Sequence, residues 1–279
     1  MQIGEIQVEM LSDGTMRNDG GGFFGTVPKV LWERAMPPDE RNRVNLRLNC
    51  VLIRAEGKNI LVDSGVGAKH NEKTQRIFHL DTGHLVADLA RHGLAPEEID
   101  AVAFSHLHFD HAGGATHRDA AGALRVTFPR AQHLVQRTDW DEATHPNPRS
   151  AGGYFEQDFA PLRQANQLEL LDGDTQIAPG VWCRVTGGHT AGHQIVTLEV
   201  AGRTACFFGD LIPTPHHLPV HYTQAYDLFP LDVMSKKREL LARAVQEQWL
   251  VLFDHEPEHP VGYVTQREDG RFGWKAAEA

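Results

Sequence analysis

The sequence has few cysteines and no long apolar segment. Its three cysteines, Cys50, Cys183 and Cys206, each lie in an apolar strand-like run, and no Cys-x-x-Cys pair occurs. An odd number of such thiols is typical of a protein core rather than of a disulfide framework or a zinc ribbon. No run approaches the roughly 18 apolar residues of a membrane helix, and the first residues lack a signal-peptide pattern. We therefore expect a cytoplasmic protein that does not enter a membrane.

Basic residues are scarce relative to acidic ones. The chain has 27 Lys and Arg against 37 Asp and Glu, a net charge of −10, and no block of Lys or Arg stands out. This balance argues against binding of nucleic acid through its phosphates. With 41% hydrophobic residues and no repeat or linker, we expect a single domain over residues 1–279. The expected partner is a small-molecule substrate, with a homodimer as the alternative to a monomer.

Histidine, by contrast, is abundant, with 17 residues. His106, His108, Asp110 and His111 directly follow the apolar run 101–104, which predicts a strand. Imidazole and carboxylate together suit zinc, and four such groups on one segment exceed what a single ion usually takes. We predict two divalent ions, most favourably Zn, with Mn, Fe or Co also suited to these ligands. The alternative is a histidine-rich loop in solvent.

Further candidate ligands follow strand-like segments elsewhere in the chain. Asp63, His189, Asp210 and His255 each come directly after an apolar run. Because ligands gather at strand ends in sheets covered by helices, we expect these segments to converge on one cleft. Asp63 and His193 are predicted to orient metal-bound histidines from behind. The alternative for Asp63 is an ordinary turn residue.

Two segments contain candidate substrate-lining residues. Residues 18–28 are too rich in glycine for a regular element, so we expect a loop over the active site, and residues 211–221 form a second loop after Asp210. The candidates in these segments and shortly after them are Phe23, Phe24, Trp32, His216 and His217. The alternatives are that the aromatic rings fill the core beneath a loop and that the two histidines reflect ordinary loop polarity.

Taken together, these residues resemble the metallo-β-lactamase superfamily, whose motif is His-x-His-x-Asp-His followed by separate His, Asp and His. The resemblance covers roughly residues 45–256. It implies an α/β (α+β) fold, a four-layer αββα sandwich with a dinuclear site along one edge of its two sheets. It assigns one ion to His106, His108 and His189, the other to Asp110, His111 and His255, and the bridging position to Asp210.

Departures from the true β-lactamases favour another branch of this family. One major group of them has cysteine at the position of Asp210 and no histidine at that of His111. The full ligand set looks like the branch of quorum-quenching lactonases and organophosphate hydrolases. Its best-known lactonases place a substrate-contacting tyrosine three residues beyond the bridging aspartate, where this chain has Pro213. Tyr222 or Tyr226 of the following loop is the candidate replacement.

The resulting hypothesis is a dinuclear hydrolase of a small ester or lactone. A hydroxide bridging the ions, formed from water whose pKa coordination lowers to about 7, would be the nucleophile. Asp210 would hold both ions, and Asp110 would pass a proton to the leaving group. One alternative is a phosphotriester (organophosphate) hydrolase on the same site. The other, from a different class, is a non-catalytic metal-binding sensor.

Overall fold

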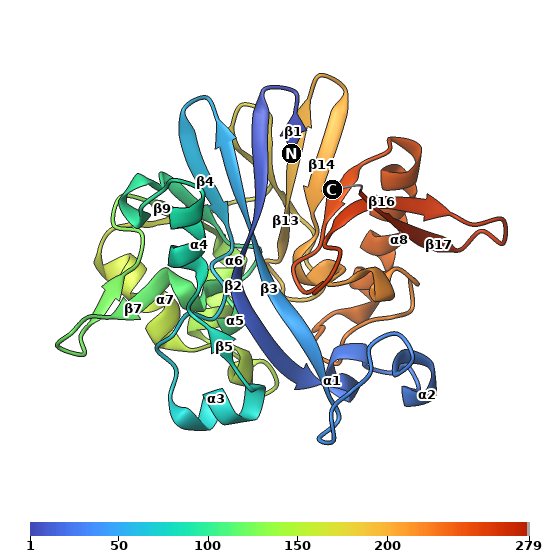
Figure 1. The fold of residues 1–279 in the computed structure, drawn as a ribbon, viewed down its shortest axis with the longest axis horizontal. Helices are drawn as coiled ribbons and strands as arrows, with labels where there is room; N and C mark the ends of the chain where they lie inside the picture. Colours follow the sequence, from blue (N-terminus) through green and yellow to red (C-terminus); the bar gives the residue numbers. More distant parts are fainter. Residues whose placement is uncertain (278–279) are drawn as a thin grey trace.

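Two β-sheets pack face to face in the computed structural model, which describes residues 1–277 (Figure 1). The first sheet has the order β1 (Gln2–Ile3), β2 (Ile6–Asp19), β3 (Arg43–Ala55), β4 (Lys58–Val62), β6 (Ala101–Ala103), β9 (Gln132–Gln136) and β10 (Leu168–Leu171), with β5 (Asp81–Thr82) paired to β2. The second has the order β11 (Thr175–Ala178), β12 (Val181–Val185), β13 (Gln194–Val200), β14 (Arg203–Phe207), β15 (Leu250–Leu252), β16 (Val261–Gln266) and β17 (Phe272–Ala276). A separate small hairpin pairs β7 (Thr116–Arg118) with β8 (Leu124–Val126).

Helices cover the outer faces of both sheets. The helices of the chain are α1 (Gly20–Phe24), α2 (Lys29–Trp32), α3 (Glu72–Phe78), α4 (Leu85–Arg91), α5 (Phe109–Ala112), α6 (Arg137–Thr144), α7 (Glu156–Gln164) and α8 (Pro230–Gln246), and only some of them cover a sheet face. In Figure 1, α4, α6 and α7 lie outside the first sheet and α8 outside the second, whereas α1 and α2 lie at the far end of β2 and β3. Within the described residues, no helix is both long and apolar enough to span a membrane.

The pattern of strand β3 explains this layering. Its central residues are apolar without a break, and alternate side chains enter different cores. Cys50 and Leu52 pack against the helices, while Val51 and Ile53 face the second sheet. A strand with both faces buried is typical of a sheet between two layers. The second sheet is covered in the same way by the apolar face of α8, and the predicted αββα sandwich is confirmed.

The cysteines are as expected, whereas the glycine-rich segment 18–28 is not. All three cysteines are buried and free, which confirms that they are core thiols. The prediction of an irregular loop over residues 18–28 was wrong for Gly20–Phe24, which form α1. The Asp19 side chain accepts a hydrogen bond from the Gly22 amide at 2.8 Å and caps this short helix, which offsets the low helix propensity of three glycines.

Strand direction brings the candidate ligands to one edge. β4 and β6 are parallel, as are β14 and β15, while β12 runs antiparallel to β13 and β13 antiparallel to β14. The carboxyl ends of β12, β14 and β15 therefore point the same way within the second sheet. Residues that follow these strands collect at a single edge of the sandwich, as the sequence predicted.

Candidate metal centre

The histidine-rich segment follows β6 and continues into the one-turn helix α5. His106 lies in the connection, His108 is the residue before the first turn of α5, and Asp110 and His111 lie within that turn. Asp139 of α6 fixes the connection, because its Oδ2 accepts a hydrogen bond from the Leu107 amide at 2.8 Å. The three imidazoles therefore approach one point from successive positions of a tightly held backbone.

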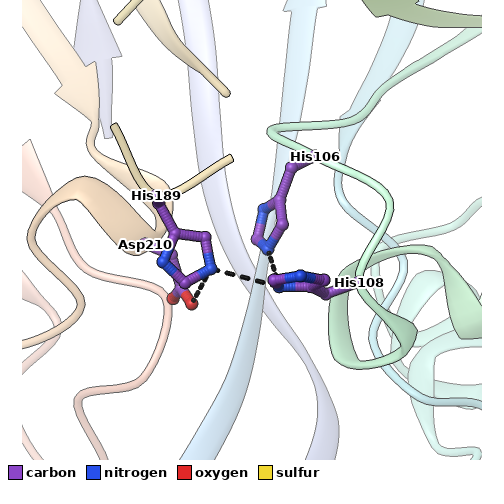
Figure 2. A group of neighbouring side chains, drawn as sticks. All are labelled: His106, His108, His189 and Asp210. Atoms are coloured by element: carbon purple, nitrogen blue, oxygen red, sulfur yellow. Dashed lines mark hydrogen bonds and ion pairs between the residues drawn. The ribbon is translucent and has the colours of Figure 1, made fainter. Parts of the chain in front are cut away.

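One cluster of candidate ligands joins this segment to the second sheet. His106 Nε2 lies 2.8 Å from His108 Nδ1, and His189 Nε2 lies 3.1 Å from the same His108 nitrogen. Asp210 Oδ2 is 3.1 Å from His189 Nε2. Figure 2 shows the four side chains turned toward a common centre, with His189 and Asp210 reaching it from the side opposite His106 and His108. This arrangement agrees with the ligand set expected for one ion.

A second cluster uses the other oxygen of Asp210. Its Oδ1 lies 3.2 Å from His255 Nε2 and 3.7 Å from His111 Nε2. Asp110 is close to the same two rings, at 3.9 Å from His111 Nε2 and 3.7 Å from His255 Nε2. The Asp254 carboxylate also belongs to this cluster, with His111, Asp210 and His255. Asp210 thus turns one oxygen toward each cluster, the geometry that a bridging carboxylate needs.

The outer nitrogen of each of three rings has its own partner. His111 Nδ1 lies 2.9 Å from Asp63 Oδ2, and His255 Nδ1 lies 2.9 Å from the Arg47 carbonyl oxygen. His189 Nδ1 lies 2.8 Å from Asp227 Oδ1. Such contacts keep the proton on Nδ1 and leave Nε2 free to bind an ion. Asp63 lies where the sequence predicted an orienting carboxylate, whereas Asp227 was not predicted.

His193 lies behind the first cluster. Its ring centroid is 5.4 Å from that of His106, and its Nδ1 lies 2.7 Å from Thr186 Oγ1. Gly209, which precedes Asp210, passes close to this ring with a φ of +50°. A Cβ at that position would come within 2.9 Å of His193 Nε2 and 3.0 Å of Ser105 Cβ. The glycine therefore lets Asp210 approach both the imidazoles and the metal-binding segment.

Several atoms of this centre are buried without a hydrogen-bond partner among the described residues. They are His111 Nε2, His193 Nε2, Asp210 Oδ1 and Asp254 Oδ2. Unpaired buried nitrogen and carboxylate atoms are costly, and a cation among them removes that cost. Because the donor set consists of imidazole nitrogen and carboxylate oxygen, the centre fits divalent ions of the zinc type.

The electrostatic environment of these groups is consistent with a cation site. Burial and neighbouring imidazoles hold the pKa of His106 and of His108 well below the usual range, so both rings are neutral, as ligands must be. Burial disfavours a charge on His255, but Asp254 and Asp210 outweigh it and raise its pKa to about 9, so the surrounding carboxylates favour a positive charge here, and a bound ion would displace the proton from this ring. Burial likewise opposes ionisation of Asp210, yet His189 and His255 lower its pKa well below the ordinary value.

A cavity of about 290 Å³ opens onto both clusters. Five candidate ligands line it, namely His108, Asp110, His189, Asp210 and His255. The remaining wall combines apolar and polar side chains, among them Phe23, Leu46, Phe78, Phe109, Asn18, Arg149, Gln224 and Tyr226. Its size and mixed lining suit a small organic molecule.

Two of the seven candidate substrate-lining residues, Phe23 and Tyr226, belong to this wall. The other five do not line the cavity, namely Phe24, Trp32, His216, His217 and Tyr222. Phe24 stacks on Trp32 with ring centroids 5.2 Å apart and on His217 at 4.6 Å, so these rings fill the core beneath α1. His217 Nε2 also contacts the Phe23 carbonyl oxygen at 3.0 Å, which leaves no edge free for a substrate.

Comparison with known proteins identifies the family. The sequence profile of the metallo-beta-lactamase superfamily matches residues 45–255, most of the chain. The chain belongs to the metallo-β-lactamase superfamily. This region contains all seven residues of the metal-binding motif, so the family resemblance inferred from the sequence is confirmed.

Relatives within the superfamily include lactonases. An N-acyl homoserine lactonase of Bacillus cereus is 31% identical over 169 residues, which cover 57% of this chain and 60% of the lactonase. The match thus spans about three fifths of that relative's length. A probable metal-dependent hydrolase from Staphylococcus aureus is 35% identical in structure-based alignment, with a TM-score of 0.91 over 100% of this chain and 99% of the other. The dizinc quorum-quenching lactonase AidC shares the fold, with a TM-score of 0.81, 19% identity and coverage of 100% and 97%.

Proposed function

We propose that this protein is a hydrolase of a small ester or lactone that uses two divalent metal ions. The observation that carries the proposal is the convergence of seven candidate ligands, five of which line one small-molecule cavity. His106, His108 and His189 would hold the first ion, and Asp110, His111 and His255 the second, with Asp210 between them. Bound there, the ions would supply Lewis acidity and make water nucleophilic at neutral pH.

The chain's own residues would complete the reaction. Asp110 is the candidate proton carrier, because its side chain lines the cavity and is 12% exposed, whereas the Asp210 side chain is 7% exposed. When the acyl C–O bond breaks, the leaving oxygen takes a proton, and a carboxyl group at the cavity wall can deliver it. Asp210 is turned toward both clusters, so its role would be to hold the ions.

The outer wall of the cavity would select the substrate. Phe23, Leu46, Phe78 and Phe109 offer an apolar surface for an acyl or aryl group. Tyr226 lines the same cavity, with its hydroxyl donating to Asn18 Oδ1 at 3.0 Å, and it is the candidate for contact with the ester oxygen. The N-acyl homoserine lactonases among the relatives support a lactone with an apolar acyl chain as the first substrate class to test.

The test compares substrate classes on one preparation of known metal content. N-acyl homoserine lactones of several chain lengths, an aryl ester and an aryl phosphotriester are assayed with the protein as purified, after chelation and after reloading with Zn²⁺. Hydrolysis of lactones or esters that disappears on chelation and returns on reloading is expected. A preference for the phosphotriester would replace the proposal with organophosphate hydrolysis, and two bound ions without hydrolysis of any substrate would favour a sensor.

A further inference from the structure

Asp254 places a third carboxylate in the second cluster. It follows β15, is 1% exposed and is held on both sides by backbone contacts. Its carbonyl oxygen accepts a hydrogen bond from the backbone N–H of Asn49 at 2.8 Å, and its Oδ1 accepts one from the backbone N–H of His255 at 3.0 Å. The side chain is therefore fixed where the two sheets meet.

The second oxygen of Asp254 is directed at the cluster without a partner. Among the described residues, Oδ2 has no hydrogen bond, although it is buried. It lies 3.7 Å from His255 Nε2, and the donor atoms of His111, Asp210, Asp254 and His255 all lie within 4.8 Å of one another. The buried carboxylates of Asp210 and Asp254 are close enough to repel each other unless a cation lies between them or one of them holds a proton.

Asp110 and Asp254 approach the cluster differently. Asp110 lines the cavity, whereas Asp254 is absent from the cavity wall and its side chain is 2% exposed. If Asp110 were the only carboxylate besides Asp210 to bind the second ion, the same group would both coordinate the metal and face the substrate. A buried carboxylate beside the same imidazoles removes that conflict, because it can neutralise the ion independently of the substrate.

We propose that the Asp254 carboxylate is an additional ligand for the second divalent ion and holds it from the protein side. This inference rests on the proposed two-metal function. It gives the second cluster a ligand in addition to the family motif and leaves Asp110 free to face the substrate. Carboxylate oxygen is a suitable ligand for zinc and for the harder ions considered above.

The direct test is a crystal structure of the wild-type protein loaded with Zn²⁺, with the ions located by anomalous scattering. An Asp254 Oδ2 to zinc distance of about 2.0–2.2 Å is expected for a ligand. A separation beyond about 3 Å would overturn the proposal, because carboxylate–zinc bonds are not that long. This measurement needs no variant and no substrate.

A substitution tests the energetic contribution. Asp254→Asn keeps an oxygen that can accept from the His255 amide but removes the negative charge. Metal-free protein is titrated with Zn²⁺ without substrate, and metal content is measured after dialysis. The first ion should bind as in the wild type, while the second should bind about 10- to 100-fold more weakly, the range seen when groups supporting a metal site are removed.

Glu256→Gln is the matched control. Glu256 is buried two residues further on, but its Oε1 accepts from the backbone amides of Glu258 and His259 and not from the centre. Wild-type affinity for both ions is expected in this variant. Equal affinity for the second ion in Asp254→Asn and wild type would overturn the proposal, while loss in both variants would assign the effect to general packing and overturn it as well.

Failure of the Asp254 ligand assignment can be distinguished from failure of the hydrolase proposal. If the second ion depends on Asp254 but no ester or lactone is hydrolysed, the hydrolase proposal fails and the ligand assignment stands. If hydrolysis and both ions persist unchanged in Asp254→Asn, only the ligand assignment fails.

Discussion

Asp227 Oδ1 lies 2.8 Å from His189 Nδ1, on the side of the ring opposite the first metal cluster. The other Asp227 oxygen accepts a hydrogen bond from the Gln224 amide at 2.9 Å. One carboxylate thus fixes both the orientation of a candidate ligand and the backbone of the segment that forms part of the cavity wall. Substitutions of Asp227 should therefore change the affinity for the first ion through His189, although Asp227 itself is not a candidate ligand.

Replacing Asp227 with Asn should weaken binding of the first ion. The amide no longer stabilises the His189 proton as a carboxylate does, and loss of such a contact typically lowers metal affinity about 10- to 100-fold. Zinc titration of the metal-free variant measures the effect. Asp232→Asn, in the first turn of α8 and outside the centre, is the control and should bind zinc as the wild type does. Unchanged affinity in Asp227→Asn would contradict the orienting role.

Asp210→Asn should lower metal retention and hydrolysis together. The carboxylate lies between the two clusters, with Oδ2 at 3.1 Å from His189 Nε2 and Oδ1 at 3.2 Å from His255 Nε2. A neutral amide offers one good acceptor in place of two charged ones. Metal content by elemental analysis and ester hydrolysis are measured on the same sample. A variant with two ions and undiminished hydrolysis would rule out the bridging role.

Tyr226→Phe should reduce lactone or ester hydrolysis by about fivefold in kcat/KM, the effect of losing one hydrogen bond of about 1 kcal/mol. Tyr226 lines the cavity, whereas Tyr222 packs against the core cluster beneath α1. Tyr222→Phe is therefore the matched control and should retain wild-type kinetics. Equal kcat/KM in the two variants would show that the Tyr226 hydroxyl does not contact the substrate.

Lys237, which is not a candidate metal ligand, predicts a pH-dependent stability of the fold. The side chain is buried in α8, and Nζ donates to the carbonyl oxygens of Pro219 at 3.1 Å and Tyr222 at 2.6 Å. Burial lowers its pKa to about 7 from 10.5, so between these values the unfolded chain binds more protons than the folded one. The free energy of unfolding should therefore rise with pH from about 7 upward through this group.

Lys237→Met removes that contribution. The free energy of unfolding of the wild type, measured in urea, should gain on the order of 2 kcal/mol over that of the variant as the pH rises from 6 to 9. Lys236→Met is the control, because Lys236 is 39% exposed and pairs with Glu239 at the surface. A difference between Lys237→Met and wild type that does not change with pH would contradict the low pKa of Lys237.

The strands and the convergence of the candidate ligands could be predicted because both depend on local patterns, whereas the αββα sandwich was expected from the resemblance to the metallo-β-lactamase superfamily. Apolar runs such as Val181–Val185 and Gln194–Val200 mark strands, and polar residues that directly follow such runs lie at strand ends. The seven histidines and aspartates of the motif could therefore be expected at one edge of the sheets.

Other parts of the site carry no such pattern. Asp227 lies in an irregular segment, and only the folded chain brings it to His189, 38 residues earlier. Phe23 and Phe24 are adjacent and chemically alike, but the turn of α1 directs one ring to the cavity and the other into a stack with Trp32. Asp254 precedes the candidate ligand His255, yet its direction toward the cluster depends on the backbone between β15 and β16.

The division of the ligands between two sheets has a consequence for synthesis of the chain. His106, His108, Asp110 and His111 follow a strand of the first sheet, whereas His189, Asp210 and His255 follow strands of the second. A nascent chain that ends before His189 lacks a complete set for either ion, and one that ends before His255 lacks a set for the second. The candidate set for the first ion is therefore complete only once the chain extends past Asp210, and the set for the second only once it extends past His255, so each set joins residues from both sheets.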